Sequence, residues 1–118
     1  MAEKWEEELE ILLAKEGILY GDTIEIPPWS TVKSIPDSPD WCDQDSFVSN
    51  YIISELYRRV KLTEERSEVI PLGDRLRAYL QVRGQVIDEY VKPLFSFVDI
   101  RIELSIEQGT IRYTKPLF

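Results

Sequence analysis

The chain has 118 residues, of which 43% are hydrophobic and 31% are charged, and it carries a net charge of −8 with one cysteine and no histidine. This length suits one domain, and the balance of apolar and charged residues is that of a folded chain rather than a disordered one. Without histidine the chain lacks the commonest general base, so serine–histidine and cysteine–histidine catalysis are excluded, as is a structural zinc site. We therefore expect one globular domain over residues 1–118, with no metal and no cofactor.

The charge is unevenly distributed along the chain. Residues 1–56 contain 13 acidic and 3 basic side chains, a balance of −10, whereas residues 57–118 contain 9 acidic and 11 basic ones, a balance of +2. A strongly acidic half repels phosphate, so nucleic acid is not the partner we expect for the surface as a whole. Neither a signal peptide nor a run of about 18 apolar residues is recognisable, so we expect no membrane contact and a cytoplasmic location.

The first expected elements are a helix and a strand. Residues 3–16 place apolar side chains on one helical face and glutamates in the first turns, where the helix dipole favours negative charge. Residues 18–26 are typical of a strand or hairpin, because polar and apolar residues alternate before Pro27-Pro28 ends any ladder.

Residues 27–45 form an irregular loop that holds four of the seven prolines and two of the three tryptophans. A loop of this length in a compact domain is usually functional or disordered, and its tryptophans argue against disorder. Trp29 and Trp41 are either rigid anchors for a partner or large side chains that cover the core. We favour the core interpretation and keep both residues as candidates for the binding surface.

Two further helices are expected in the middle of the chain. Asp45 is a good N-cap for a helix whose stripe runs through Val48, Ile52, Leu56 and Val60. Residues 62–73 are expected to be a connector with at most a short helical turn. A third helix is expected to begin at the cap Asp74, to be divided near Gly84 and to end at Pro93.

The clearest strand covers residues 98–106, where isoleucine, valine and leucine alternate with polar residues. A turn at Gln108-Gly109 returns the chain in a second strand over 110–114. The alternation leaves one face wet, which favours an α+β fold with three helices on one face of a small, mainly antiparallel sheet that ends in this C-terminal β-hairpin. We expect the strand near Ile24 to join the hairpin, and residues 110–114 to offer an edge through which two copies could pair as a homodimer.

The leading functional hypothesis is a non-enzymatic protein-interaction module, an adaptor or inhibitor, that presents its acidic N-terminal surface to a basic protein partner. It is favoured by the charge of the first half and by the lack of a recognisable catalytic motif. The residues expected to carry the acidic surface, in addition to the two tryptophans, are Glu6, Glu7, Glu10, Asp37 and Asp40.

Two alternatives remain open at this point. The basic residues of the second half would form an RNA- or anion-binding patch if Arg58, Arg59, Arg75 and Arg77 converged between the second and third helices. The aspartates of the proline-rich loop would support a small carboxylate-based, metal-dependent enzyme, although their spacing lacks the central glycine and distal glutamate of an EF-hand. Helix capping is the simpler role for Asp43 and Asp45.

Overall fold

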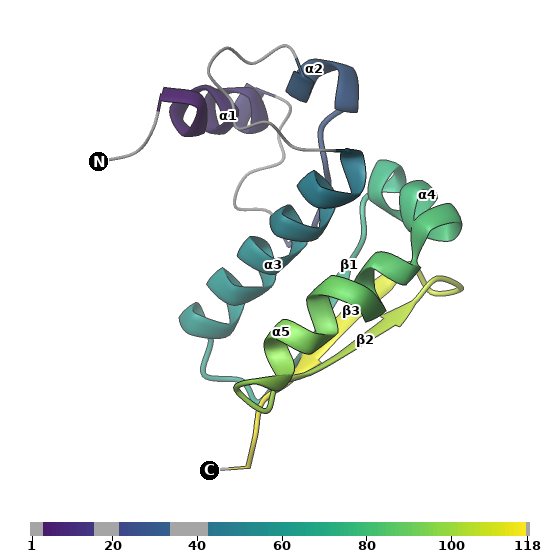
Figure 1. Ribbon diagram of the computed structural model, residues 1–118. Coiled ribbons are helices and arrows are strands. Elements are labelled where there is room, and N and C mark those ends of the chain that lie inside the picture. Colours follow the sequence, from purple (N-terminus) through teal and green to yellow (C-terminus); the bar gives the residue numbers. More distant parts are fainter. Residues whose placement is uncertain (1–3, 16–21, 34–42, 118) are drawn as a thin grey trace.

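The computed structural model describes residues 4–15, 22–33 and 43–117, apart from the side chains of Trp5 and Glu6. Its strands are β1 (Ser67–Pro71), β2 (Arg101–Ser105) and β3 (Thr110–Thr114). Its helices, shown in Figure 1, are α1 (Lys4–Lys15), α2 (Trp29–Lys33), α3 (Gln44–Leu62), α4 (Asp74–Arg83), the π-helical segment η1 (Ile87–Val91) and α5 (Lys92–Ser96). The expected α+β class is confirmed. The three expected helices correspond to α1, α3 and the stretch from α4 to α5, while α2 lies within the segment expected to be irregular.

The sheet has three antiparallel strands in the order β1-β3-β2. The expectation that the strand near Ile24 joins the hairpin is wrong, because the third strand is β1, in the segment expected to be a connector. Ile24 instead forms an isolated parallel bridge with Leu72. Pro27-Pro28 come only three residues after Ile24, and prolines lack the backbone N–H that strand pairing requires, so no longer ladder can form there. In β1, by contrast, Val69 and Ile70 have the β-branched side chains that strands favour.

The position of β3 overturns a second expectation. Residues 110–114 form the central strand, so they pair on both sides and cannot offer a free edge to another copy of the chain. The edges of the sheet are β1 and β2, and within the hairpin only β2 lies at an edge. Pairing of two chains through the hairpin therefore stays a prediction for β2 alone.

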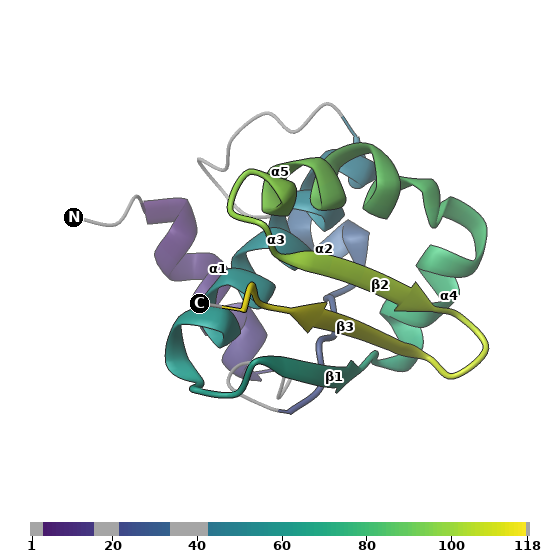
Figure 2. The same cartoon turned by 90° about the horizontal axis from the view of Figure 1, so that it is seen from below.

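One face of the sheet is covered by helices and the other is open. Ile70, Ile102, Ile111 and Tyr113 point into the core from the three strands, and all four are buried. The opposite face carries Arg112, which donates a hydrogen bond of 2.8 Å to Glu103 on the neighbouring strand. Figure 2 shows the three strands in front of the helices, with no helix over the near face. The expected wet face is thus confirmed.

Capping by Asp43 is confirmed, whereas the caps expected at Asp45 and Asp74 are wrong by two residues and by one residue. The N-cap of α3 is Asp43, whose side chain accepts a hydrogen bond of 2.9 Å from the Ser46 backbone N–H. Asp74 is the first residue of α4, and its N-cap is Gly73, which has no capping side chain. The cap is supplied from elsewhere: Glu25 accepts hydrogen bonds from the backbone N–H groups of Arg75 (3.0 Å) and Leu76 (2.8 Å).

Pro93 does not end the third helix, contrary to expectation. The turn before it is π-helical, and the Lys92 backbone N–H donates to the carbonyl oxygen of Ile87, five residues earlier. Proline normally breaks a helix because it lacks an N–H and its ring meets the carbonyl four residues before it. The wider π turn places Pro93 at the start of α5, where a missing N–H is tolerated, so the helical path continues to Ser96.

The core lies between the sheet and α3, α4 and α5, and α1 and α2 extend it on the far side of α3 (Figure 1). α1 contributes the buried Leu13, and α2 contributes the buried Val32. The Trp29 ring is half-buried and packs against Phe47, with 5.7 Å between ring centroids. This contact favours the core interpretation of Trp29 over that of an exposed anchor.

Candidate functional site

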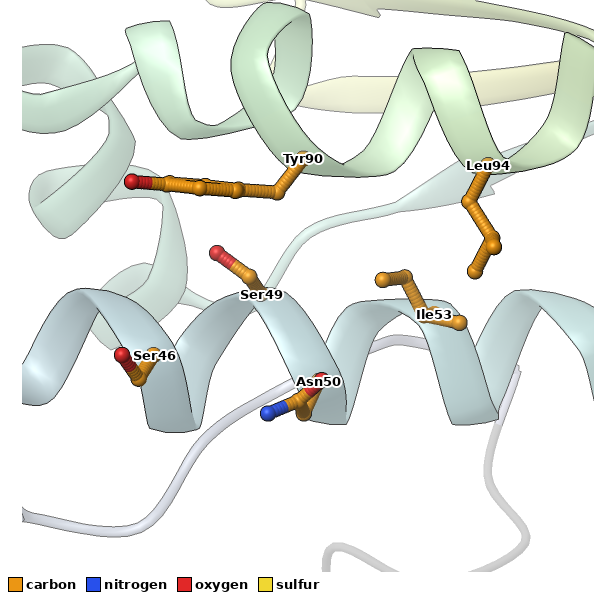
Figure 3. A pocket seen from close by; sticks show the side chains of 6 residues that line it. All are labelled: Ser46, Ser49, Asn50, Ile53, Tyr90 and Leu94. Atoms are coloured by element: carbon orange, nitrogen blue, oxygen red, sulfur yellow. The ribbon is translucent and has the colours of Figure 1, made fainter. Parts of the chain in front are cut away.

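A groove of about 340 Å³ runs between α3 and the segment formed by η1 and α5. In Figure 3, Ile53 and Leu94 point toward each other across it, while the Ser49 hydroxyl and the ring of Tyr90 lie toward its other end. The residues that line it are Ser46, Ser49, Asn50 and Ile53 of α3, together with Tyr90 of η1 and Leu94 of α5. The spacing on each wall is helical, so one face of each element forms the groove.

Apolar surface is unusually exposed along the η1–α5 wall. The exposed fractions are 52% for Tyr90, 48% for Leu94 and 87% for Phe97. These residues are four and three positions apart, which places them along one side of the helical path. Val98 in the following turn is also exposed. A contiguous apolar strip of this kind marks an interaction surface more often than isolated apolar residues do.

Charged residues gather at the end of the groove where α3 begins. Asp45 and Arg83 form an ion pair, with 3.2 Å between Arg83 Nε and a carboxylate oxygen. The hydrogen bond and the charge of Asp45 raise the pKa of Arg83, and the carboxylates of Glu89 and Asp43 raise it further. The Asp45–Arg83 pair is neutral as a whole, and Asp43 at the N-cap of α3 and Glu89 on η1 add two negative charges near this end of the groove.

Ser49 and Asn50 supply the polar groups of the middle of the groove. Ser49 is buried and its hydroxyl donates to the Asp45 carbonyl oxygen at 2.7 Å, so it is held in place by its own helix. Asn50 is exposed, and its amide points out of the groove in Figure 3. The groove is therefore apolar where Ile53 and Leu94 face each other and has neutral polar groups along the rest of its α3 wall.

The acidic residues proposed from the sequence are only partly described by the structure. Glu7 and Glu10 are exposed on α1, which lies on the other side of α3 from α5 (Figure 1). Glu6 belongs to the same helix, but its side chain lies outside what is described. Asp37, Asp40 and Trp41 also lie outside the described residues.

The four arginines proposed for an anion site do not converge. Arg58 and Arg59 lie near the end of α3 and both contact Glu55, with Arg58 Nε 3.2 Å from a carboxylate oxygen and Arg59 Nη1 3.1 Å from the carbonyl oxygen. Arg75 and Arg77 lie at the start of α4, at the opposite end of the fold in Figures 1 and 2.

The second pair of arginines is also engaged with the backbone. Arg75 donates to the Ile26 carbonyl oxygen, and Arg77 donates to the carbonyl oxygens of Ile106 and Glu107. These contacts join α4 to the chain before α2 and to the turn between β2 and β3. Their role in the structure is to hold these elements together.

A buried polar cluster on α3 was not predicted from the sequence. Tyr51, Glu55 and Arg59 are all buried and are spaced four residues apart, a pattern that could have revealed it. Burial raises the pKa of the Tyr51 hydroxyl, and the neighbouring Glu55 carboxylate adds to the effect. The three side chains interact with one another, with Arg59 Nη1 3.6 Å from the Glu55 carboxylate and the Tyr51 hydroxyl 3.5 Å from it, and we assign this cluster to the fold.

Within the described ranges there is no group of three or more acidic, cysteine or histidine side chains that could hold a metal ion. Asp43 and Asp45 are engaged as a cap and in an ion pair. None of the helices in the described part of the chain is long and apolar enough to cross a membrane. Comparison of the chain with protein-family models, with curated proteins and with solved structures finds no match.

Proposed function

We propose that this protein is a non-enzymatic interaction module, an adaptor or inhibitor, that binds another protein through the groove between α3 and α5. The observation that carries the proposal is the apolar strip formed by Tyr90 of η1, Leu94 of α5 and Phe97 at the end of α5, which are half to almost fully exposed. Aromatic and large aliphatic side chains at the centre of an interface supply most of its binding energy. Grooves between helices are common places for such recognition.

In this proposal the acidic first half of the chain has a supporting role. Complementary charge speeds the encounter of two proteins and selects the partner, while the apolar contact supplies most of the affinity. The net charge of −10 over residues 1–56 favours a basic partner. Glu6, Glu7, Glu10, Asp37 and Asp40 remain the residues proposed for this electrostatic surface.

The groove is tested by comparing variants of two exposed apolar residues, one inside the groove and one outside it. Leu94→Asp places a charge in the groove, whereas Val82→Asp changes an apolar residue of α4 that is 77% exposed. Tagged wild type and both variants are used to capture proteins from native extract, followed by quantitative mass spectrometry. We expect to find proteins that are captured equally by wild type and by Val82→Asp. Their recovery with Leu94→Asp should be at least tenfold lower. Equal recovery with all three chains would refute the groove as the binding surface.

The role of the acidic surface is tested with the partner protein that the capture experiment identifies. Glutamine and asparagine replace the five acidic residues together, and affinity is measured at several salt concentrations. We expect weaker binding at low salt and a flatter dependence on salt, since exposed charges are screened over about 8 Å at physiological ionic strength. An unchanged affinity and an unchanged salt dependence would remove the acidic surface from the proposal.

A further inference from the structure

Resting on the proposed function, we infer that the occupant of the groove is an amphipathic helix of the partner that carries lysine or arginine beside its apolar face. Both walls are helices, and their backbone groups are hydrogen-bonded within the helices. An extended peptide that adds itself to a sheet edge would find no edge here. Recognition therefore depends on side chains, as it does when an amphipathic helix lies in an apolar groove.

The dimensions of the groove suit about two turns of helix. Ser46 and Ile53, which lie at its two ends on α3, are seven residues apart, or about 10 Å along the helix axis. A ligand helix with apolar residues at positions i, i+4 and i+7 covers the same length. Those residues would contact Ile53, Leu94 and the Tyr90 ring, and Phe97 would extend the contact beyond the groove.

The charge of the partner is inferred from the end of the groove where α3 begins. Asp43 is the N-cap of α3 beside Ser46, and Glu89 precedes Tyr90 on η1, so both carboxylates adjoin residues that line the groove. Asp45 is paired with Arg83, which leaves these two negative charges in excess. The start of α3 adds only about half a positive charge, so the balance stays negative. Asp43 and Glu89 are exposed, and they are the carboxylates that a ligand could reach. A basic residue of the ligand is favoured at this end and an acidic one is repelled.

Synthetic helical peptides of about 16 residues provide a direct test. One has leucine at i, i+4 and i+7 with lysines beside this apolar face, and a second has glutamates in place of the lysines. Binding of each fluorescein-labelled peptide to the full chain is measured by fluorescence anisotropy. We expect the lysine peptide to bind at least fivefold more tightly at low salt, with a preference that shrinks as salt is added.

Three variants of the protein locate the effect. Leu94→Asp should abolish binding of both peptides, and Val82→Asp should leave both unchanged. The double variant Asp43→Asn, Glu89→Gln should keep leucine-dependent binding but lose the preference for lysine. Each variant is first checked by circular dichroism for an unchanged fold, which we expect because all four substituted residues are exposed.

The outcomes separate this inference from the proposed function. If Leu94→Asp loses captured proteins from extract while the two peptides bind equally, the basic helix is refuted and the interaction module stands. Binding of the lysine peptide that Leu94→Asp leaves intact would refute the groove as its site. A wild-type dimer in analytical ultracentrifugation that Leu94→Asp dissociates would show that a second copy fills the groove, and this result would also overturn the inference.

Discussion

The carboxylate of Glu25 links two distant segments of the chain, and its removal gives the sharpest test of the fold. It accepts hydrogen bonds from three backbone N–H groups, those of Ile26 (2.9 Å), Arg75 (3.0 Å) and Leu76 (2.8 Å). The last two belong to the first turn of α4, whose own N-cap is a glycine. Glu25 therefore performs the capping role that a serine or aspartate next to a helix usually performs.

The size of the effect follows from these contacts. Loss of an N-capping side chain costs about 1 kcal/mol and at most about 2 kcal/mol. Removal of a negative charge from the start of a helix adds about 0.3–1 kcal/mol. We therefore expect Glu25→Ala to lower the free energy of unfolding by about 2 kcal/mol. Glu25→Gln keeps one acceptor oxygen and should lose about half as much.

Gly73 provides an independent way to disturb the same cap. A Cβ atom at this position would lie 2.2 Å from the carboxyl carbon of Glu25 and 2.7 Å from its Cβ. The Gly73 backbone is extended, with φ −66° and ψ 161°, a conformation that alanine adopts without strain. Gly73→Ala is therefore expected to destabilise the fold by displacing Glu25. Gly73→Ala and Glu25→Ala should therefore lose much of the same stabilising contribution, that of the Glu25 cap.

Urea denaturation of the wild type, the two single variants and the double variant measures this shared loss. The double variant should be destabilised by about 1 kcal/mol less than the sum of the two single effects. The unfolding slope should stay constant, so that a change of the midpoint reports stability alone. Strictly additive effects, or a Glu25→Ala midpoint equal to that of wild type, would refute the capping role of Glu25.

Three further predictions concern other parts of the fold. Gly109→Ala should destabilise the protein by about 1–2 kcal/mol in urea denaturation, because Gly109 has φ 66° and an added Cβ would lie 3.0 Å from the Arg77 guanidinium. A loss of stability smaller than that caused by Gln108→Ala would contradict this reasoning. Tyr79→Phe should raise the melting temperature, since the buried Tyr79 hydroxyl has no hydrogen-bond partner among the described residues; a lower melting temperature would reveal a missed partner. Burial and the hydrogen bond to Glu68 raise the pKa of Tyr113 above its ordinary value of 10. The protonated hydroxyl therefore stabilises the folded state fully below pH 10, and this contribution to stability is lost as the pH rises above 10. Tyr113→Phe should therefore flatten the loss of stability above pH 10, as measured by urea denaturation at successive pH values, and an unchanged slope would refute the assignment.

The elements that local pattern determines were predictable from the sequence. The apolar stripe of α3 and the strict alternation around Ile102 each follow one period, and the structure has a helix and a strand in those places. The turn at Gln108-Gly109 was also predictable, because Gly109 supplies the positive φ that the turn requires. In these segments the local preference and the tertiary environment favour the same conformation.

Contacts between distant residues decided the parts that were not predicted. β1 is only five residues long, follows three charged residues and ends with a proline, so nothing in its own sequence separates it from a connector. Its pairing with β3 makes it a strand. The cap of α4 comes from Glu25, about fifty residues away along the chain, and no rule based on neighbouring residues could assign it. The convergence expected of the four arginines was wrong for the same reason, because the partners of Arg75 and Arg77 are distant in the sequence. The carbonyl oxygens that Arg77 contacts, for example, belong to the β2–β3 turn.

The candidate site depends on the least predictable local feature, the π-helical turn before Pro93. If Pro93 had ended the helix, as expected from its usual effect, Leu94 and Phe97 would not follow Tyr90 along one helical path. The π turn lets the path continue, and the exposed apolar side chains then line up beside α3. π turns are rare, and those that occur are frequently found at functional sites. The coincidence of this turn with the exposed apolar wall of the groove is the physical reason to place binding there rather than on the buried cluster around Glu55.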